Sequence, residues 1–289
     1  MKQKNKERTG LLIALAVLLL VILAGVFFLA MALEDPWISG GTSPAPENHA
    51  TGSTMGPETT APTEPPIPLN PYTPEDFVLE NGYMTCAAGD YMHGIDVSFW
   101  QGEIDWQKVK ESGVKFVMVR LGSRGSEQGV LSTDDNVYQN LNGAREAGLL
   151  VGGYFFSQAI SVEEAVEEAH YVLDILNGFP LDMPVVFDWE FMGDQARTYH
   201  VGAELLTACT KTFCDVIEGA GYEAMVYFNP MQAKLKVNLE ELVDYHFWLA
   251  MYDTPMDYPY QVDMWQYSCT GSVPGIQGDV DLNLYLKYD

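Results

Sequence analysis

Two acidic residues, Asp188 and Glu190, stand two positions apart in an otherwise apolar segment that runs from Met183 to Phe191. The apolar run predicts a buried strand. Side chains alternate along a strand, so both carboxyl groups should point the same way. Ionisable groups in apolar surroundings must be paired, solvated or protonated. The pair is therefore either structural, holding an arginine or loop amides, or fit for acid–base chemistry on an uncharged substrate.

Short apolar runs alternate with helical segments along the rest of the chain. Strands are predicted at residues 94–98, 115–121, 150–156, 185–189, 224–228, 247–251 and 263–267, and helices at 104–111, 134–146, 161–176 and 204–220. Ser161 and Glu164 form a capping box at the start of the third helix. Apolar strands that alternate with helices favour a parallel sheet covered by helices.

We therefore expect an α/β fold, an irregular TIM-like β/α barrel, because the last strands follow one another without room for full helices. A doubly wound open sheet is the alternative. It is disfavoured because no glycine-rich phosphate loop follows any strand.

Polar and aromatic residues recur at the carboxyl ends of these strands. They are Asp96, Arg120, Tyr154, Ser157, Asp188, Glu190, Tyr227, Asn229, Tyr252, Asp253, Trp265, Gln266 and Tyr267. In β/α barrels this face carries the active site. Any one buried Tyr or Trp is explained by packing alone. Carboxylates together with aromatic walls fit carbohydrate chemistry, because aromatic faces pack on the C–H surfaces of sugars.

The formal net charge of −25 argues against nucleic acid and anionic membrane surfaces as partners. A neutral polymer such as a glycan fits better, although acidity that serves only solubility is an alternative. The five histidines show no metal-ligand spacing, so we expect no metal and no cofactor. Cys209 and Cys214 lie on different sides of one predicted helix and should not pair. A Cys86–Cys269 disulfide is conceivable and stays open.

The N-terminus combines a basic segment with a long apolar run. Residues 1–10 contain four basic residues, and residues 11–33 form 23 apolar positions, enough to cross a bilayer. The positive-inside rule predicts a cytoplasmic tail at 1–10, a single-pass transmembrane anchor at 11–33 and an extracellular C-terminal domain. Ala30-Met31-Ala32 resembles a signal-peptidase site. If the run is cleaved there, the protein is secreted.

Residues 34–87 are predicted to be a linker rich in Pro, Thr, Ser and Gly, with its most biased stretch at residues 59–66. Such composition buries too little apolar surface to offset chain entropy. Residues 88–289 are long enough for one catalytic barrel domain with a substantial core. We expect this domain to be monomeric.

Eight sequence blocks, taken in order, resemble glycoside hydrolase family 25, the Chalaropsis-type lysozymes. They begin with residues 94–102 and continue at 116–120, 151–154, 184–190, 227–229, 248–252, 265–267 and 280–283. One block alone is weak, but eight at family-like spacing are highly specific. The resemblance extends from about Gly94 to Leu286 and implies a barrel that hydrolyses the β-1,4 bond between N-acetylmuramic acid and N-acetylglucosamine in peptidoglycan glycan strands.

The resemblance also implies residue roles. Glu190 matches the general acid, and Asp188 matches the group that stabilises an intermediate formed by the acetamido group of the substrate. Asp96 and Asp281 match two further acidic positions. The residues expected to bind substrate are Arg120, Tyr154, Tyr227, Asn229, Trp248, Tyr252, Trp265 and Gln266. Phe155 departs from the pattern, since many relatives carry His there at a rim contact. A catalytically inactive wall-glycan-binding module and a membrane-tethered scaffold are the alternatives.

Overall fold

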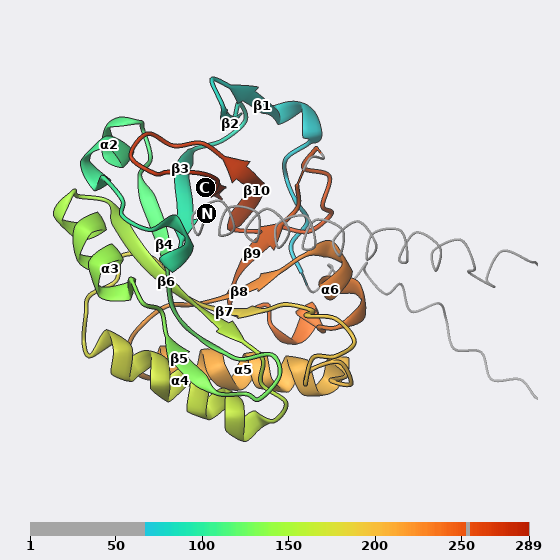
Figure 1. Ribbon diagram of the computed structural model, residues 1–289. Helices are drawn as coiled ribbons and strands as arrows, with labels where there is room; N and C mark the ends of the chain where they lie inside the picture. Colours follow the sequence, from blue (N-terminus) through green and yellow to red (C-terminus); the bar gives the residue numbers. More distant parts are fainter. Residues whose placement is uncertain (1–66, 253–254, 289) are drawn as a thin grey trace, which may run out of the picture. The chain divides into compact units, whose positions relative to one another are not determined.

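Eight strands close into a barrel in the computed structural model, which describes residues 67–252 and 255–288 (Figure 1). They are β3 (Tyr91–Val97), β4 (Phe116–Arg124), β6 (Leu150–Ser157), β7 (Val185–Trp189), β8 (Ala224–Phe228), β9 (His246–Ala250), β10 (Met264–Gly271) and β11 (Val280–Leu286). The order around the barrel is β3-β11-β10-β9-β8-β7-β6-β4, and pairing of β3 with β4 closes it. A further strand, β5 (Leu131–Thr133), pairs with the carboxyl end of β4. The predicted α/β barrel is confirmed.

The last strands depart from the strand–helix repeat. Only the short helices α6 (Pro230–Leu235) and η3 (Leu239–Glu241) lie between β8 and β9. β11 runs antiparallel to both β10 and β3. The connection at residues 272–279 is too short for the crossover that a parallel strand needs, so β11 must reverse direction. The predicted irregularity is confirmed, but β11 was not among the predicted strands and the expected parallel sheet is a mixed one.

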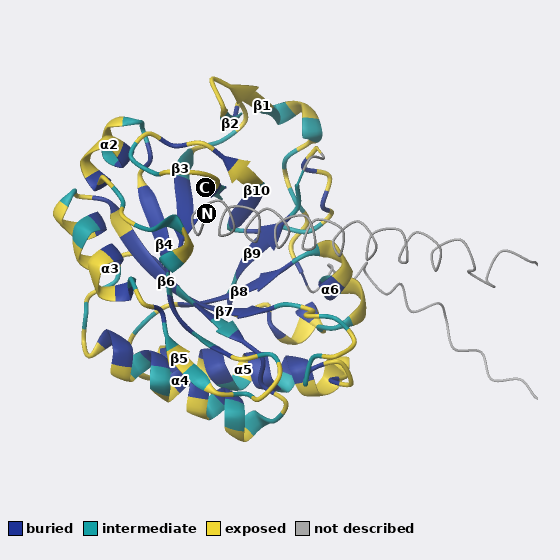
Figure 2. Cartoon of the chain, viewed as in Figure 1, coloured by how far each residue is buried: buried dark blue, intermediate teal, exposed yellow. Residues whose placement is uncertain are grey.

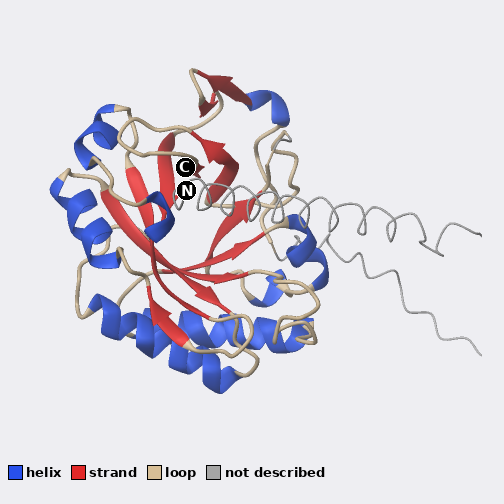
Figure 3. Ribbon diagram, in the orientation of Figure 1, coloured by secondary structure: helices blue, strands red, loops and turns tan. Residues whose placement is uncertain are grey.

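Four helices that follow the earlier strands cover the outside of the barrel (Figure 3): α2 (Trp106–Glu111), α3 (Val137–Glu146), α4 (Val162–Leu176) and α5 (Ala203–Gly219). All four were predicted, with ends that differ by at most three residues. α4 begins as the capping signal predicts, because Ser161 Oγ accepts a hydrogen bond from the backbone N–H of Glu164 at 3.3 Å. α4 and α5 lie side by side against the strands (Figure 1).

The barrel strands are buried on both faces (Figure 2). One face packs against the helices, and the other fills the interior of the barrel with large apolar side chains. The interior cluster consists of Phe116, Met118, Met183, Val186, Met225, Tyr227, Trp248, Ala250 and Met264. Polar residues at the carboxyl ends of the strands therefore rest on a packed apolar floor.

Residues 67–87 are folded and do not belong to a linker. β1 (Phe77–Glu80) follows a turn of 3-10 helix, η1 (Pro74–Asp76), and pairs with β2 (Tyr83–Cys86) in an antiparallel hairpin. Asn81 and Gly82 form its turn with φ angles of 51° and 87°. The domain thus begins earlier than residue 88, because the Asn-Gly turn and the apolar residues around it outweigh the polar composition upstream.

The remaining N-terminal predictions, the cytoplasmic tail at 1–10, the anchor at 11–33 and the linker up to residue 66, lie outside the described residues. Within the described part of the chain, no helix is both long and apolar enough to cross a bilayer. Cys86, Cys209 and Cys214 are buried free thiols, so the Cys86–Cys269 disulfide is not formed.

Candidate active site

A cavity of about 220 Å³ opens at the carboxyl ends of the barrel strands. It is lined by Asp96, Arg120, Tyr154, Phe156, Asp188, Glu190, Tyr227, Trp248, Tyr252, Gln266 and Asp281. The structure therefore gathers in one place all four predicted catalytic residues and six of the eight predicted substrate-binding residues. They come from all eight strands of the barrel and from residues that closely follow them.

Asp188 and Glu190 enter the cavity from the end of β7, as alternation along the strand requires. Asp188 is 5% exposed, and its Oδ1 is buried without a hydrogen-bond partner among the described residues. Burial raises the pKa of Asp188 well above its ordinary value, and the negative charges of Glu190 and Asp96 add to the rise. Burial, and then the charge of Asp96, also raise the pKa of Glu190. Both groups therefore release their protons at a higher pH than an exposed carboxyl group does.

Asp96 and Asp281 face each other across the antiparallel pair β3–β11. Burial raises the pKa of Asp96 to about 6, although hydrogen bonds from Asn283 and Gln266 oppose the rise. Burial and the nearby charge of Asp96 raise the pKa of Asp281 to about 8. Asp281 thus keeps its proton to a higher pH, and Asp96 is the group that supplies negative charge first.

Two amide side chains hold Asp96 in place. Gln266 Nε2 and Asn283 Nδ2 each donate to Asp96 Oδ2 at 2.8 Å. The orientation of Gln266 is fixed because its Oε1 accepts from the hydroxyl groups of Tyr227 and Tyr252. Trp248 Nε1 donates to Asn283 Oδ1 at 2.9 Å and fixes the second amide in the same way. Both amides must therefore present N–H groups to the carboxylate.

Arg120 is the cation of the cavity and is itself held by Asp134. Its Nε and Nη2 lie 2.8 Å from Asp134 Oδ2, and its guanidinium group stacks over the Phe99 ring at 4.9 Å. The positive charge of Arg120 lowers the pKa of Asp188 and partly offsets burial. Phe99 belongs to a turn of 3-10 helix, η2 (Phe99–Gln101), whose next residue, Trp100, is 74% exposed.

Two predicted substrate-binding residues lie away from this cavity. Asn229 caps α6, where its Oδ1 accepts from the backbone N–H of Gln232 at 3.0 Å. Trp265 points away from the barrel interior, packs against Phe77 at 5.3 Å and donates from Nε1 to the Met251 carbonyl. Adjacent residues on a strand face opposite sides, so Trp265 and Gln266 could not both enter the cavity.

Phe155 likewise faces outward: it is fully buried against Phe213 and Tyr171, so it is no rim contact. Phe156 and Asn283 were absent from the predicted site. Alternation from Tyr154 along β6 could have found Phe156, and the spacing from Asp281 along β11 could have found Asn283. No group of His, Cys, Asp and Glu side chains in the described ranges has the arrangement of a metal site.

Comparison with known proteins adds to this geometry. Residues 95–276, more than half of the chain, match the family described as glycosyl hydrolases family 25. The chain belongs to this family. The cavity with its four carboxyl groups is therefore the candidate active site of a family 25 glycoside hydrolase.

The individual relatives have modest sequence identity to this chain. The chain is 29% identical over 195 residues to the autolytic lysozyme of Clostridium acetobutylicum, covering 66% of this chain and 55% of that protein. It is 27% identical over 215 residues to lysozyme M1 of Streptomyces globisporus, covering 67% of each. The solved structure of the modular autolysin LytC from Streptococcus pneumoniae with a synthetic peptidoglycan ligand has a TM-score of 0.61. At 22% identity over 72% of this chain and 52% of LytC, it shows a shared fold. The chain thus spans about half the length of the clostridial lysozyme and of LytC.

Proposed function

We propose that the domain is an N-acetylmuramidase of the Chalaropsis type, which hydrolyses the β-1,4 bond between N-acetylmuramic acid and N-acetylglucosamine in peptidoglycan. One observation carries this proposal: Glu190, with a raised pKa, shares a cavity with the negatively charged Asp96 and with Asp188. Glycosidic cleavage needs a protonated acid at the leaving oxygen and a carboxylate near the developing positive charge. The lysozyme names of the two curated relatives support the same substrate.

In the proposed reaction, Glu190 donates its proton to the glycosidic oxygen as the bond to the anomeric carbon breaks. The acetamido oxygen of the same sugar bonds to that carbon, and the carboxylate of Asp188 stabilises the positive charge that develops. The Glu190 carboxylate then takes a proton from water, whose oxygen attacks the anomeric carbon and releases the acetamido group. Burial, and then the negative charge of Asp96, raise the pKa of Glu190 and so favour its protonated form before the first step.

Mass spectrometry of fragments from purified peptidoglycan tests this function. Digestion by the wild-type domain should leave N-acetylmuramic acid at the new reducing ends, and the Glu190→Gln variant should release almost no fragments in the same time. Digestion in ¹⁸O-labelled water should place the label on that reducing end, and early NMR spectra should show retained anomeric configuration. Reducing ends of N-acetylglucosamine, or no digestion by the wild type, would contradict the proposal. Inverted configuration would contradict the acetamido step alone.

We also propose that residues 11–33 anchor the protein in the cell membrane as a single span, with the catalytic domain in the extracellular wall space and acting as a monomer. The basic residues before the apolar run and its length of 23 residues support this topology. Cleavage after Ala32 would make the enzyme secreted and would leave the catalytic proposal unchanged.

A further inference from the structure

The backbone of Glu190 lies just beyond the sheet. The β6–β7 ladder ends with Ser157 opposite Trp189, and the β7–β8 ladder ends with Asp188 opposite Tyr227. Neither neighbouring strand is therefore paired with Glu190. A residue that has left its ladder needs other partners for its backbone, and without them its position is poorly defined.

Two buried glutamines take the place of the missing strand neighbours. Gln158, the first residue after β6, donates from Nε2 to the Glu190 carbonyl at 2.9 Å. Gln232 in α6 donates from Nε2 to the Trp189 carbonyl at 2.6 Å. Gln158 is 0% exposed and Gln232 is 4% exposed. The two peptide groups that flank the Cα of Glu190, Trp189–Glu190 and Glu190–Phe191, thus each accept a hydrogen bond at their carbonyl oxygen.

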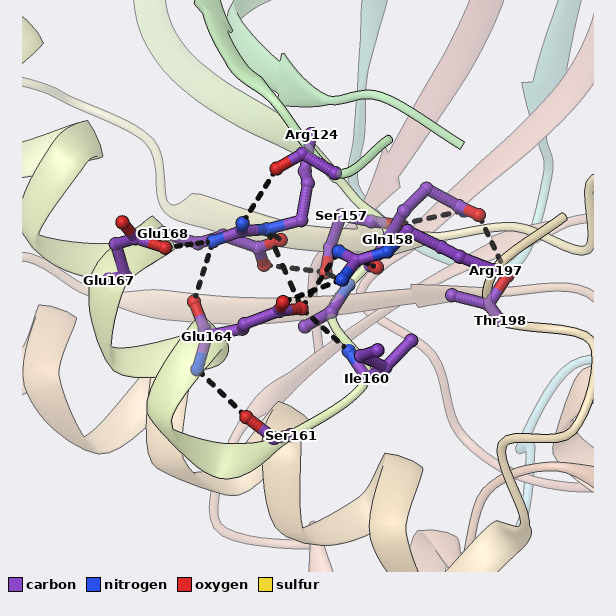
Figure 4. A network of polar contacts seen from close by, with 12 residues as sticks. Arg124, Ser157, Gln158, Ile160, Ser161, Glu164, Glu167, Glu168, Arg197 and Thr198 are labelled. Atoms are coloured by element: carbon purple, nitrogen blue, oxygen red, sulfur yellow. Dashed lines mark hydrogen bonds and ion pairs between the residues drawn. The ribbon is translucent and has the colours of Figure 1, made fainter. Parts of the chain in front are cut away.

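Each glutamine is locked in the orientation that presents its N–H groups. Gln158 Oε1 accepts from the hydroxyl of Thr198 at 2.8 Å (Figure 4). A flipped amide would turn Oε1 toward the Glu190 carbonyl oxygen, where two acceptors would face each other. Gln232 Oε1 accepts from the backbone N–H of Asn229 at 2.7 Å in the cap of α6. The cap assigned above to Asn229 therefore also orients the second glutamine.

Gln158 is in turn tied to α4 by an ion pair. Arg197 Nη1 donates to the Gln158 carbonyl at 3.2 Å, and the same guanidinium group binds both carboxyl oxygens of Glu164 at 2.8 and 2.6 Å (Figure 4). Thr198 and Arg197 belong to the segment that follows Glu190, so this contact fixes the loop after the catalytic acid as well as the acid itself.

A second ion pair supports the residue before Gln158. Ser157 Oγ donates to Glu168 Oε2 at 2.6 Å, and Glu168 Oε1 accepts from Arg124 Nε at 2.7 Å. Arg124 is 3% exposed and Glu168 is 0% exposed, and Arg124 also pairs with Glu167 at 2.7 Å. Figure 4 shows these contacts. None of Ser157, Arg124, Glu167 and Glu168 lines the catalytic cavity.

We propose that Gln158, oriented by Thr198, is a positioning residue for the proposed general acid Glu190. The inference rests on the proposed glycosidase function. It assigns a role to polar groups that touch no substrate: they hold Glu190 within reach of the glycosidic oxygen and inside the field of Asp96. A shift of about 1 Å in a catalytic group lowers rates by about 100-fold, so the loss should fall on turnover and not on substrate binding.

The test compares four variants with the wild type on soluble glycan strands. Gln158→Leu removes the donor to the Glu190 carbonyl. Thr198→Val removes the hydroxyl that orients Gln158 without opening a cavity, and Thr198→Ser restores it. The matched control is Thr207→Val. It removes one partly buried hydrogen bond, which the Thr207 hydroxyl accepts from the backbone N–H of Asn238 at 2.9 Å, away from the catalytic cavity.

The expected result for Gln158→Leu is a kcat reduced about 10- to 100-fold per folded molecule, with KM changed less than about 2-fold. Its alkaline pH limit should move to lower pH, because an acid released from burial beside Asp96 regains a more ordinary pKa. Thr198→Val should share this pattern, Thr198→Ser should retain most of the rate, and Thr207→Val should change melting temperature alone.

If Gln158→Leu and Thr198→Val keep the wild-type kcat and pH profile, or lose kcat only as much as they lose folded protein, the positioning role is wrong. If Gln158→Leu does not fold, Thr198→Val still tests the positioning role. An active wild type with unchanged variants overturns only this inference. A wild type that cleaves no glycan overturns the proposed function, and the positioning role with it.

Discussion

Asp281 lies directly opposite Asp96, although 185 positions separate them in the chain and they belong to the last and first strands of the barrel. Burial raises the pKa of Asp281 to about 8 and that of Asp96 to about 6, and the charge of Asp96 adds to the rise at Asp281. Because both values are raised above the ordinary value of 3.8, the folded state binds protons more tightly than the unfolded state.

This cluster should make the domain less stable as pH rises. Its stabilising contribution is complete below the unfolded pKa and is lost as pH rises through the folded values. Asp281→Asn should therefore raise the melting temperature by about 3–8 °C at pH 9 and by much less at pH 5, from a gain on the order of 1–2 kcal/mol. Calorimetry at both pH values checks this, and an equal shift at both would show that Asp281 does not titrate in this range.

Glu190→Gln should lower kcat by about 10²- to 10⁴-fold while leaving the fold and the affinity for glycan fragments intact, because it removes a proton and little volume. Asp188→Asn should also be severe. The measurements are turbidity loss of purified walls and calorimetric binding of glycan fragments. A Glu190→Gln enzyme that clears walls at close to the wild-type rate would show that another group donates the proton.

Arg120→Gln should move the acidic limit of activity to higher pH and so narrow the pH range in which the enzyme works. The charge of Arg120 lowers the pKa of Asp188, so its removal raises that pKa further and delays formation of the stabilising carboxylate as pH rises. The alkaline limit, set by Glu190, should move little, because Arg120 is not among the groups that shift its pKa. Profiles of kcat/KM against pH measure both limits. If the alkaline limit moves and the acidic limit stays, Arg120 does not act through Asp188.

Trp100 should contact glycan beyond the catalytic cavity. The ring is 74% exposed and packs at 4.4 Å on Phe99, which in turn stacks under the cavity residue Arg120. Trp100→Ala should raise KM for long glycan strands by about 2- to 10-fold and change kcat little, since the ring meets neither reacting atom.

A suitable control is Val243→Ala, an exposed apolar residue just before the amino end of β9, on the opposite side of the barrel from the cavity. Equal KM values for Trp100→Ala and Val243→Ala would remove Trp100 from the substrate contacts.

Protease added outside intact cells should release an active domain by cutting before Ile67. Ile67 is 4% exposed and Leu69 pairs with Tyr260, so the chain from residue 67 onward is protected by its own packing. Before digestion, the protein should sediment with membranes, and residues 1–10 should resist the protease. A soluble mature protein that starts just after Ala32 would instead identify the apolar run as a cleaved signal.

The sequence predicted the site better than its surroundings for a physical reason. Asp188 and Glu190 were found because alternation along a strand needs only local spacing. Asn229 and Trp265 were misplaced because residue type does not reveal whether an amide caps a helix or which face of a strand an aromatic ring takes. The Asn229-Pro230 pair is a helix-start signal, and Gln266, next to Trp265, already occupied the inward position.

Long-range geometry was beyond local patterns. The antiparallel course of β11 follows from a connection too short for a crossover, which can be recognised only when β11 is itself seen as a strand. The two glutamine contacts to the end of β7 come from segments about 30 to 40 residues away and leave no periodic trace in the sequence.

The antiparallel closure by β11 also affects when the protein gains activity. Asp281 and Asn283 arrive on the strand that completes the barrel, and their partner Asp96 belongs to the strand that begins it. Pairing over such a separation is slow, because closing a large loop costs chain entropy before any stabilising contact forms. During synthesis, nearly the whole domain must emerge from the ribosome before the four carboxyl groups can meet. A nascent or truncated chain that lacks β11 lacks Asp281 and Asn283, so the cavity with its four carboxyl groups cannot be complete in it.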